Sequence, residues 1–411
     1  MFRSLSFYVL LGLVLGLAAG VAIQRYGGSE WQAVAQGFAP IGGLWLNALR
    51  MTVVPLVFAL LVTGVASVTD AASTGKLTAR AMVLFSVLLV FGALYSFAFT
   101  GALLHWWPVD RADAAKIMEG IDASAASIPP PDFGAWVKAL APANPIAAAA
   151  SDAVLPLSVF ALFFGFAVTR LAPPLRDLLV NLFRAVSEAM VVIIHWVLLA
   201  GPIGVFSLAL GVGASAGLAA AGTLAHYIAI AVIVGLGVTL IAFVLAVTWG
   251  ALPIGRFVAA ATPVWAIAFS TQSSLASLPA MLEASRQLKI SERIADLILP
   301  LAVAIFRFTS PVINLVVVLF VAHVHGVVLA PQAYLAGILA SYAASIAAVG
   351  LPGQVSFITS IAPICLAMGV PIDLLGVLLA VEVIPDIFRT LGNVTGDLAA
   401  TAILSRKERA L

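Results

Sequence analysis

The chain has 411 residues, of which 63% are hydrophobic and only 9% are charged, and its mean hydropathy is +1.15. So few polar residues cannot cover a water-soluble particle, so the composition excludes a soluble globular protein and indicates a polytopic protein of the lipid bilayer. The net charge of +2 excludes an electrostatic nucleic-acid-binding protein, and the single Cys365 excludes an intrachain disulfide.

Eight stretches are apolar and, at about 20 residues or more, long enough to cross a bilayer. The first follows Arg3, as in a signal peptide, but its apolar run continues to Ile23 and further spans follow, so we expect a retained transmembrane helix. The eight stretches lie near residues 6–24, 39–68, 81–106, 153–172, 186–212, 224–252, 297–322 and 372–404.

Two further apolar regions, 256–285 and 332–370, are interrupted in the middle. The first contains a polar run from Ser270 to Ser277 and then Pro279, and the second contains the run from Gly350 to Gly353. Non-helical backbone in lipid leaves amides and carbonyls unpaired at roughly several kcal/mol each, so we expect two enclosed re-entrant hairpins. Each hairpin precedes a span, and such paired units are typical of inverted-repeat transporters with a mid-membrane site.

Basic residues predict the orientation of the chain. If the eight spans alternate and both hairpins re-enter, thirteen basic residues fall on one side and four on the other. Cytoplasmic loops are rich in Lys and Arg, so we expect both termini in the cytoplasm, a multi-pass protein of the plasma (inner) membrane, and an external loop at 107–147. The thirteen are Arg3, Lys76, Arg80, Arg170, Arg176, Arg184, Arg256, Arg286, Lys289, Arg293, Arg406, Lys407 and Arg409; the four are Arg25, Arg111, Lys116 and Lys138.

The last span carries Glu382, Asp386, Arg389, Asn393 and Asp397. At about 100° per residue these five fall within an arc of roughly 80°, so they share one face that points to protein or water. An ionised group at the bilayer centre costs about 2.5 to 3.5 kcal/mol, so the face needs internal pairing or a polar ligand. A self-satisfied salt-bridge ladder between two helices is the alternative to a ligand site.

The chemistry of this face suits an amino acid. Arg389 can grip a carboxylate through two donors, and Asp386 can accept from an ammonium group. Asn393 offers both a donor and an acceptor, and Thr390 lies at the border of the face. No Cys-x-x-Cys or His-Glu-x-x-His spacing occurs, so we expect no metal site.

Three other groups of buried polar residues are open to interpretation. Arg50 in the second span could snorkel or pair, which favours a structural role. Arg307 lies in a polar break of the seventh span that ends at Pro311, and it could either neutralise the acidic last span or take part in substrate or ion coupling. The five histidines are not expected to cluster, and we expect interfacial or packed side chains rather than a proton relay.

The two hairpins and the run from Arg389 to Asp397 (Arg-Thr-Leu-Gly-Asn-Val-Thr-Gly-Asp) resemble the dicarboxylate/amino acid:cation symporters, the glutamate-transporter family. The resemblance covers nearly the whole chain, and the stretches 49–57, 154–165 and 200–206 support it. It implies a homotrimer of elevator-type transporters. The implied division is scaffold helices 1 and 2 at 1–80, a third helix of the transport domain plus the external loop at 81–152, scaffold helices 4 and 5 at 153–223, and the transport domain at 224–411.

The same resemblance implies roles for individual residues. Asp386, Arg389, Thr390 and Asn393 hold the ammonium group and the two carboxylates of the substrate. Backbone and hydroxyl groups of the hairpin tips complete the cradle, and they are those of Ser273, Ser274, Val349, Gly350 and Gly353, with Ser310 retaining a family hydroxyl. An ammonium partner at Asp386 favours aspartate or glutamate over a plain dicarboxylate.

The chain departs from the family where cations are bound. The family's seventh helix carries Asn-Met-Asp-Gly-Thr, whose aspartate binds sodium, and here the stretch is Phe306 to Ser310, with Phe308 in place of that aspartate. Arg307 could replace sodium by pairing with Asp397, or it could replace a hairpin arginine, because Gln272 stands there. Glu382 could carry a proton, so proton coupling is the leading hypothesis, with residual sodium coupling and uncoupled exchange left open.

The sequence thus predicts an all-α membrane protein that carries an acidic amino acid by secondary active transport. No cofactor is expected, and the co-transported ion is a proton, with sodium undecided. The alternatives are a sodium-coupled dicarboxylate symporter, or an anion channel or amino-acid sensor on the same scaffold. An enzyme is disfavoured because Ser273 and Ser274 have no evident His-Asp relay in the sequence.

Overall fold

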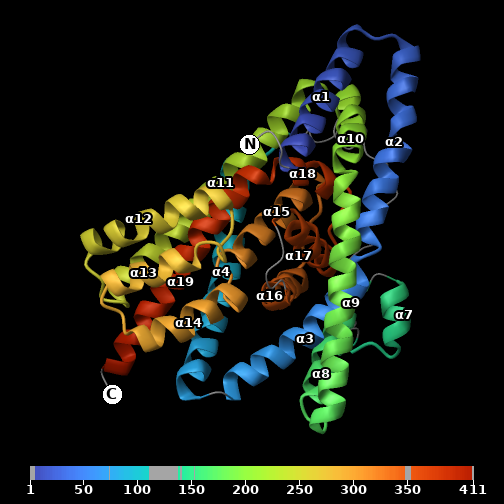
Figure 1. Cartoon of the computed structure of the whole chain (residues 1–411). Coiled ribbons are helices and arrows are strands. Elements are labelled where there is room, and N and C mark those ends of the chain that lie inside the picture. The colour runs from blue at the N-terminus through green and yellow to red at the C-terminus, as the bar shows by residue number, and fades with distance from the viewer. Residues whose placement is uncertain are drawn as a thin grey trace.

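The fold is entirely helical wherever the structure describes it. The computed structural model describes residues 5–73, 75–110, 138, 141–151, 153–347 and 353–409, and every regular element in these ranges is an α-helix (Figure 1). A helix satisfies its backbone amides and carbonyls within its own segment, which a bilayer requires. The all-α prediction is therefore confirmed for the described residues.

The helices follow one another along the chain. They are α1 (Leu5–Tyr26), α2 (Ser29–Arg50), α3 (Val53–Ser73), α4 (Lys76–Trp106), α7 (Pro145–Ala150), α8 (Val154–Val168), α9 (Pro173–Leu199), α10 (Gly201–Ala216), α11 (Leu218–Thr248), α12 (Ile254–Thr271), α13 (Leu278–Gln287), α14 (Glu292–Ile305), α15 (Ser310–Val324), α16 (Pro331–Ala347), α17 (Gly353–Met368), α18 (Leu375–Val381) and α19 (Val383–Arg409).

Seven helical segments of the described chain are long and apolar enough to span a membrane. The predicted span at 186–212 is divided at Ala200 into α9 and α10, and the predicted span at 153–172 corresponds to the shorter α8. The count of eight spans therefore stays a prediction. The seven segments are Tyr8–Tyr26, Ser29–Ala66, Lys76–Trp106, Pro173–Leu199, Leu218–Thr248, Ile254–Thr271 and Glu292–Val324.

The first interrupted region forms a helical hairpin. Helices α12 and α13 pack against each other and are joined by residues 272–277. Gln272 has φ 52° and ψ 34°, the left-handed conformation that commonly ends a helix. In the second region α16 packs against α17, and the residues between them, 348–352, lie outside the described ranges.

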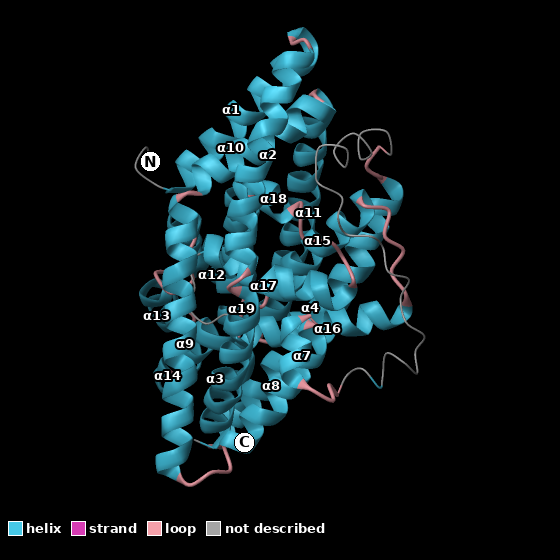
Figure 2. Ribbon diagram, turned by 90° about the vertical axis from the view of Figure 1, so that its right-hand side faces the viewer, coloured by secondary structure: helices cyan, strands magenta, loops and turns pink. Residues whose placement is uncertain are grey.

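Two groups of helices pack mainly among themselves. Helix α1 packs against α10, α10 against α2, and α3 against both α8 and α9. Helix α19 packs along α11, α12 and α14, while α4 packs against α15 and α16. Figures 1 and 2 show α19 running through the middle of its group, with the hairpin of α12 and α13 beside it. The last helix is therefore enclosed by protein.

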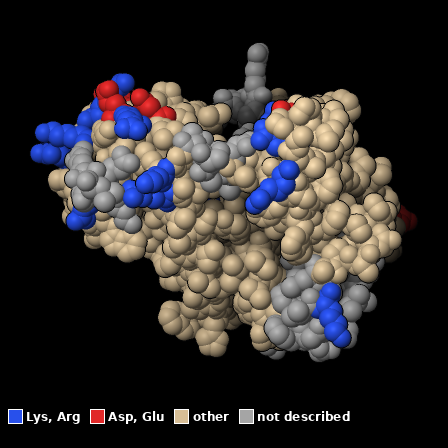
Figure 3. All heavy atoms as spheres, turned by 90° about the horizontal axis from the view of Figure 1, so that it is seen from below, with Lys and Arg blue, Asp and Glu red and all other residues tan. Residues whose placement is uncertain are grey.

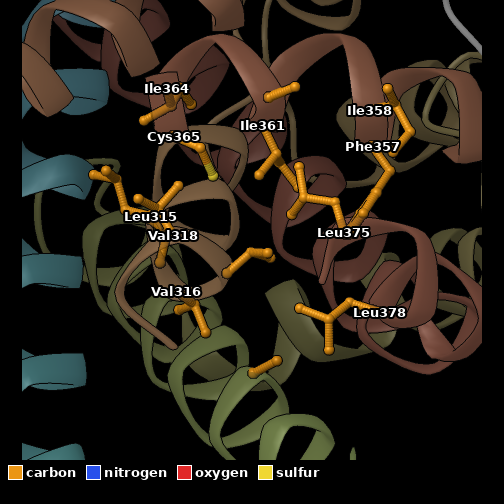
Figure 4. Packing of buried hydrophobic residues seen from close by; sticks show 14 of the residues in the cluster. Leu315, Val316, Val318, Phe357, Ile358, Ile361, Ile364, Cys365, Leu375 and Leu378 are labelled. Atoms are coloured by element: carbon orange, nitrogen blue, oxygen red, sulfur yellow. The ribbon is translucent and has the colours of Figure 1, made fainter. Parts of the chain in front are cut away.

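The interior between α15, α17 and α18 is apolar and tightly filled. Figure 4 shows side chains from all three helices pointing toward one another, and Leu315, Phe357, Ile361, Cys365 and Leu378 are all buried. Apolar transfer from water drives little association inside lipid, so close van der Waals packing is the main contribution here.

Basic side chains gather on one face. The α3–α4 connection, the α8–α9 connection and the C-terminal end lie at the lower side of the molecule in Figure 1. Seen from below, that face carries many Lys and Arg side chains and fewer Asp and Glu (Figure 3). The grouping of Lys76, Arg80, Arg170 and Arg176 at these two connections follows the predicted pattern of basic loops.

Candidate functional site

The polar face of the last span points into the protein. Glu382, Asp386, Arg389, Asn393 and Asp397 are all buried, and Arg389 is 2% exposed. The span is interrupted at Glu382, between α18 and α19, but the Asp386 amide still donates to the Glu382 carbonyl at 2.9 Å. The enclosure that the stripe predicts is therefore confirmed.

The interruption has a local cause in Pro385. Proline has no amide proton, and its ring clashes with the carbonyl four residues earlier, which here belongs to Val381, the last residue of α18. Glu382 has φ −61° and ψ −20°, so the chain keeps its direction through the break. The side chain of Glu382 thereby stays on the same face as that of Arg389.

Arg389 is the centre of a closed cluster. Its Nη2 contacts Glu382 Oε1 at 2.5 Å, its Nη1 donates to Asn314 Oδ1 at 3.1 Å, and its Nε lies 3.6 Å from Asp386 Oδ1. The Tyr227 hydroxyl donates to the second oxygen of Glu382 at 2.8 Å. These five residues, from α11, α15 and the last span, are called the Arg389 cluster.

The pairing inside the Arg389 cluster differs from a ladder between helices. The charged members Glu382, Asp386 and Arg389 all belong to the last span, whereas the members from other helices, Tyr227 and Asn314, are neutral. No ion pair of the cluster therefore joins two helices. Its polar links to α11 and α15 are hydrogen bonds in which Tyr227 and Asn314 are the neutral partners. Such bonds contribute about 1.5 to 3 kcal/mol each when one partner is charged.

The break of the seventh span is tied to the last span by Thr309. Helix α14 ends at Ile305 and α15 begins at Ser310, as the position of Pro311 predicts. The Thr309 amide donates to Asn393 Oδ1 at 2.9 Å, and the Thr309 hydroxyl lies 2.8 Å from both Asn393 Oδ1 and the Arg389 carbonyl. The polar groups of Thr309 at the break therefore have partners in the last span.

Two glycines of the final motif allow this close approach. A Cβ at Gly392 would stand 2.4 Å from Thr309 Cγ2, and a Cβ at Gly396 would stand 3.0 Å from Phe308 Cβ. The first contact is closer than real side chains allow and the second is tighter than most, so the glycines let the break pack directly against α19. The sequence motif thus serves packing as well as polarity.

Arg307 lies among the acidic groups of the last span. It interacts electrostatically with Asp386 and Asp397, and Arg307 is the charged neighbour that acts on Asp397. Asp397 is 1% exposed. Three carboxylates face two guanidinium groups in this region, so its formal charge is −1 when all five are ionised. Within the described residues, no group of three or more His, Cys, Asp or Glu side chains could hold a metal ion.

The hairpin tip and the remaining predicted residues are placed less centrally. Ser273 Oγ accepts from the Ala276 amide at 3.2 Å, and the Ser277 hydroxyl donates to the Ser273 carbonyl at 2.9 Å, so these bonds stay within the tip. The hairpin is fixed to α19 by Trp265 Nε1, which donates to Thr395 Oγ1 at 2.9 Å.

Other predicted binding residues have varied positions. Ser310 is buried, and its hydroxyl has no hydrogen-bond partner among the described residues. The Thr390 hydroxyl donates to the Asp386 carbonyl at 2.9 Å. Gly353 begins α17, whereas Val349 and Gly350 lie outside the described residues. The contributions of these residues and of Ser273 and Ser274 to binding stay predictions.

Three polar residues of the site escaped the sequence analysis. Asn314 and Thr309 lie on either side of Pro311, and an amide within so apolar a span could have marked the first of them. Tyr227 lies beside His226 in the apolar α11, where an aromatic residue usually serves packing, so no local signal marks it as part of the site.

Two histidines that are distant in sequence interact. His226 stacks on Trp107 with ring centroids 4.2 Å apart, and it interacts electrostatically with His323. His323 Nε2 accepts from the Val109 amide at 3.3 Å. The ends of α11 and α15 bring these two side chains near each other, and His226 is packed against an aromatic ring, as expected of a packed side chain.

The enclosed charges, the two broken spans and the helical hairpin are typical of one class, the secondary transporters with a polar site between interrupted helices. Comparison with known proteins agrees. The chain belongs to the sodium:dicarboxylate symporter family, whose sequence profile matches residues 5–407. The resemblance drawn from the motifs is confirmed.

Individual relatives match along nearly their whole length. The chain is 25% identical over 408 residues to the proton/glutamate-aspartate symporter of Escherichia coli (strain K12), covering 98% of this chain and 93% of that protein. It is 26% identical to the proton/sodium-glutamate symport protein of Bacillus subtilis (strain 168), at 98% and 92% coverage. It is 24% identical to the C4-dicarboxylate transport protein of the same organism, at 99% and 94% coverage. The family consists of transporters, which supports a function other than enzymatic catalysis.

Proposed function

We propose that the protein is a secondary active transporter of an acidic amino acid such as aspartate or glutamate. The observation that carries the proposal is the buried guanidinium of Arg389, which already holds a carboxylate and is surrounded by further polar groups of the same helix. A protein that must release a solute needs such a site enclosed within movable helices rather than facing lipid. Relatives named as glutamate and aspartate symporters support this substrate class.

Each binding residue then has a chemical role. Arg389 binds the side-chain carboxylate through parallel donors, and Asp386 accepts from the ammonium group. Asn393 and Thr390 bind the backbone carboxylate. Groups of the two hairpin tips close the site, and they come from Ser273, Ser274, Val349, Gly350 and Gly353, with Ser310 at the start of α15.

The proposal includes an elevator movement within a homotrimer. Residues 1–80 and 153–223 form the scaffold, and 81–152 and 224–411 supply the moving part and the external loop. The preferential packing of α19 with α11, α12 and α14 supports this division. Basic connections on one face support a cytoplasmic location for that face and for the C-terminal end that lies on it. The proposal places the N-terminus in the cytoplasm as well, in a protein of the inner membrane.

Proton coupling fits the charge of the site better than ordinary sodium coupling. The region carries a formal −1, and an acidic amino acid brings a further −1, so a buried complex needs compensating positive charge. Arg307 acts as a fixed cation near Asp397, and Phe308 offers no side-chain oxygen where the family has a sodium-binding aspartate. Glu382 is the group that takes the proton.

A second candidate is a sodium-coupled C4-dicarboxylate symporter. The relative named as a C4-dicarboxylate transport protein favours it. Asp386 argues against it, because a dicarboxylate has no ammonium group to balance this buried carboxylate. An anion channel or an amino-acid sensor on the same scaffold is a third reading.

Transport by purified protein in proteoliposomes tests the proposal. With labelled L-aspartate or L-glutamate we expect saturable counterflow, and uptake that a proton gradient stimulates and a sodium gradient alone does not. Stimulation by sodium alone contradicts proton coupling. Uptake of succinate without amino-acid uptake contradicts the role of Asp386, and flux without counterflow contradicts a carrier.

A further inference from the structure

We infer that Glu382 is an intramolecular competitor of the substrate, because its carboxylate occupies the Arg389 guanidinium and must leave before a substrate carboxylate can bind there. The inference rests on the proposed function. It assigns to Glu382 a regulatory part in binding, distinct from that of the residues that contact the substrate.

The donors of Arg389 limit what can bind at once. A carboxylate binds a guanidinium best through two parallel N–H groups. In the structure Nη2 is held by Glu382 and Nη1 by Asn314, while Nε has no hydrogen-bond partner among the described residues and lies 3.6 Å from Asp386. A substrate carboxylate that takes the Nη1 and Nη2 pair therefore displaces Glu382.

The position of Glu382 suits an exchangeable group. It lies at the break that Pro385 makes between α18 and α19, and its amide reaches the Leu379 carbonyl only at 3.3 Å. Its other carboxylate oxygen is held by Tyr227, which is fully buried. A group at such a break can swing without unwinding a continuous helix, and Tyr227 offers it a second anchor away from Arg389.

Protonation of Glu382 decides whether its own carboxylate or that of the substrate binds Arg389. An ionised Glu382 pairs with Arg389, whereas a protonated Glu382 loses its charge and gains a donor of its own. The titratable and charged groups that act on Glu382 are Tyr227 from α11 and Asp386 and Arg389 from α19. Arg307 acts on the last two, from the break between α14 and α15.

The other helices packed on this region contribute no charge to it among the described residues. Asn314 of α15 is neutral, and α1 and α10 face α18 with apolar side chains, which are Leu13, Leu17, Ala209 and Val212. Exchange at Arg389 then keeps one carboxylate on the guanidinium throughout. The substrate arrives as Glu382 takes up a proton, so one guanidinium links the two events.

Equilibrium binding of L-aspartate and L-glutamate to the purified full-length protein, measured from acidic to alkaline pH, tests the inference. We expect wild-type affinity to fall as pH rises, by up to about tenfold per pH unit for one linked proton. Glu382→Gln should bind more tightly at alkaline pH and lose this slope. Glu188→Gln, on the exposed surface of α9, should keep the wild-type slope.

The outcomes separate the inference from the proposed function. Wild-type protein that binds neither amino acid at any pH contradicts the proposed function itself. Wild-type binding without a pH slope, or a slope that Glu382→Gln leaves unchanged, overturns the inference alone. If Glu382→Gln does not fold, Glu382→Asp, with its shorter reach to Arg389, should bind more tightly at alkaline pH with a weaker slope, and a wild-type slope there also overturns it.

Discussion

Helix α9 and the segment formed by α14 and α15 are both long and apolar, yet they face opposite surroundings. Only 17% of the most apolar part of α9 is buried within the protein, against 83% for the segment Glu292–Val324. The outer surface of α9 bears exposed Leu178, Leu182 and Trp196, as expected of a helix that meets lipid. Hydropathy alone does not distinguish the two. Both segments carry polar residues, but Asn314 of the enclosed segment is bonded to Arg389, whereas Arg184 and Glu188 of α9 lie exposed.

Among substitutions of enclosed and exposed residues, replacing the enclosed Arg389 should have the largest effect on binding and stability. Arg389→Ala leaves Glu382 and Asp386 buried without their partner, which costs about 3 to 5 kcal/mol, and it removes the carboxylate-binding group. We expect a loss of acidic amino-acid binding of more than about 100-fold and a lower unfolding temperature. Arg176→Ala, at the exposed start of α9, is the matched control and should change neither. Unchanged affinity in Arg389→Ala would transfer recognition to another cation such as Arg307.

An added methyl group should destabilise the protein more at the enclosed Gly392 than at the open Gly101. Gly392→Ala places a Cβ 2.4 Å from Thr309 Cγ2, so the break must shift, at a cost of about 1 to 3 kcal/mol. Gly101→Ala in α4 meets nothing within 4 Å and should be neutral or stabilising by up to about 1 kcal/mol. Thermal unfolding in the same detergent compares them. Equal destabilisation by both would show that the packing of Gly392 is not special.

The hydroxyl of Thr309 should contribute a smaller amount. Thr309→Val keeps the shape but removes the hydrogen bonds to Asn393 and the Arg389 carbonyl, at about 1 to 2 kcal/mol. Thr262→Val, whose hydroxyl bonds only to its own helix at the exposed surface of α12, should cost less. Unfolding temperature and ligand affinity are the measurements. A loss at Thr262 as large as that at Thr309 would contradict a special role for the break.

The smallest effect is expected from His325, at the end of α15. Burial lowers the pKa of His325, but the hydrogen bond and the charge of Asp373 outweigh it, so the pKa lies above the usual value. The pair therefore stabilises the folded state fully below the ordinary pKa of histidine, and this contribution disappears as pH rises through the raised value. It amounts to less than about 1 kcal/mol. Asp373→Asn should remove this pH dependence of the unfolding temperature, and a pH profile identical to wild type would contradict the pairing.

Composition and periodicity predicted most of what makes the site. The all-helical fold, the break before Pro311 and the common face of the last span follow from local rules of hydropathy, proline chemistry and helix geometry. These rules act within a few residues of one another. They can therefore be applied to the sequence without any knowledge of how the helices pack.

Pairing between particular side chains could not be predicted in the same way. The stripe brings Glu382, Asp386 and Arg389 to one face, but which carboxylate the guanidinium selects depends on side chains that α11 and α15 bring beside it. Tyr227 bonds to Glu382 and Asn314 bonds to Arg389, and both residues reach the site only because their helices pack against the last span. The interruption at Glu382 is different, since Pro385 is a local signal in the sequence that a helix is broken near this point.

The Arg389 cluster brings all of its own hydrogen-bonding partners with it. Every hydrogen bond or ion pair described for its five members joins residues between 227 and 393, and none reaches α1, α2, α3, α8, α9 or α10. The proposed movement of that later half past the earlier helices would break no polar contact of this set. Under the proposed elevator movement, the buried charges would travel together with their partners and stay shielded from hydrocarbon.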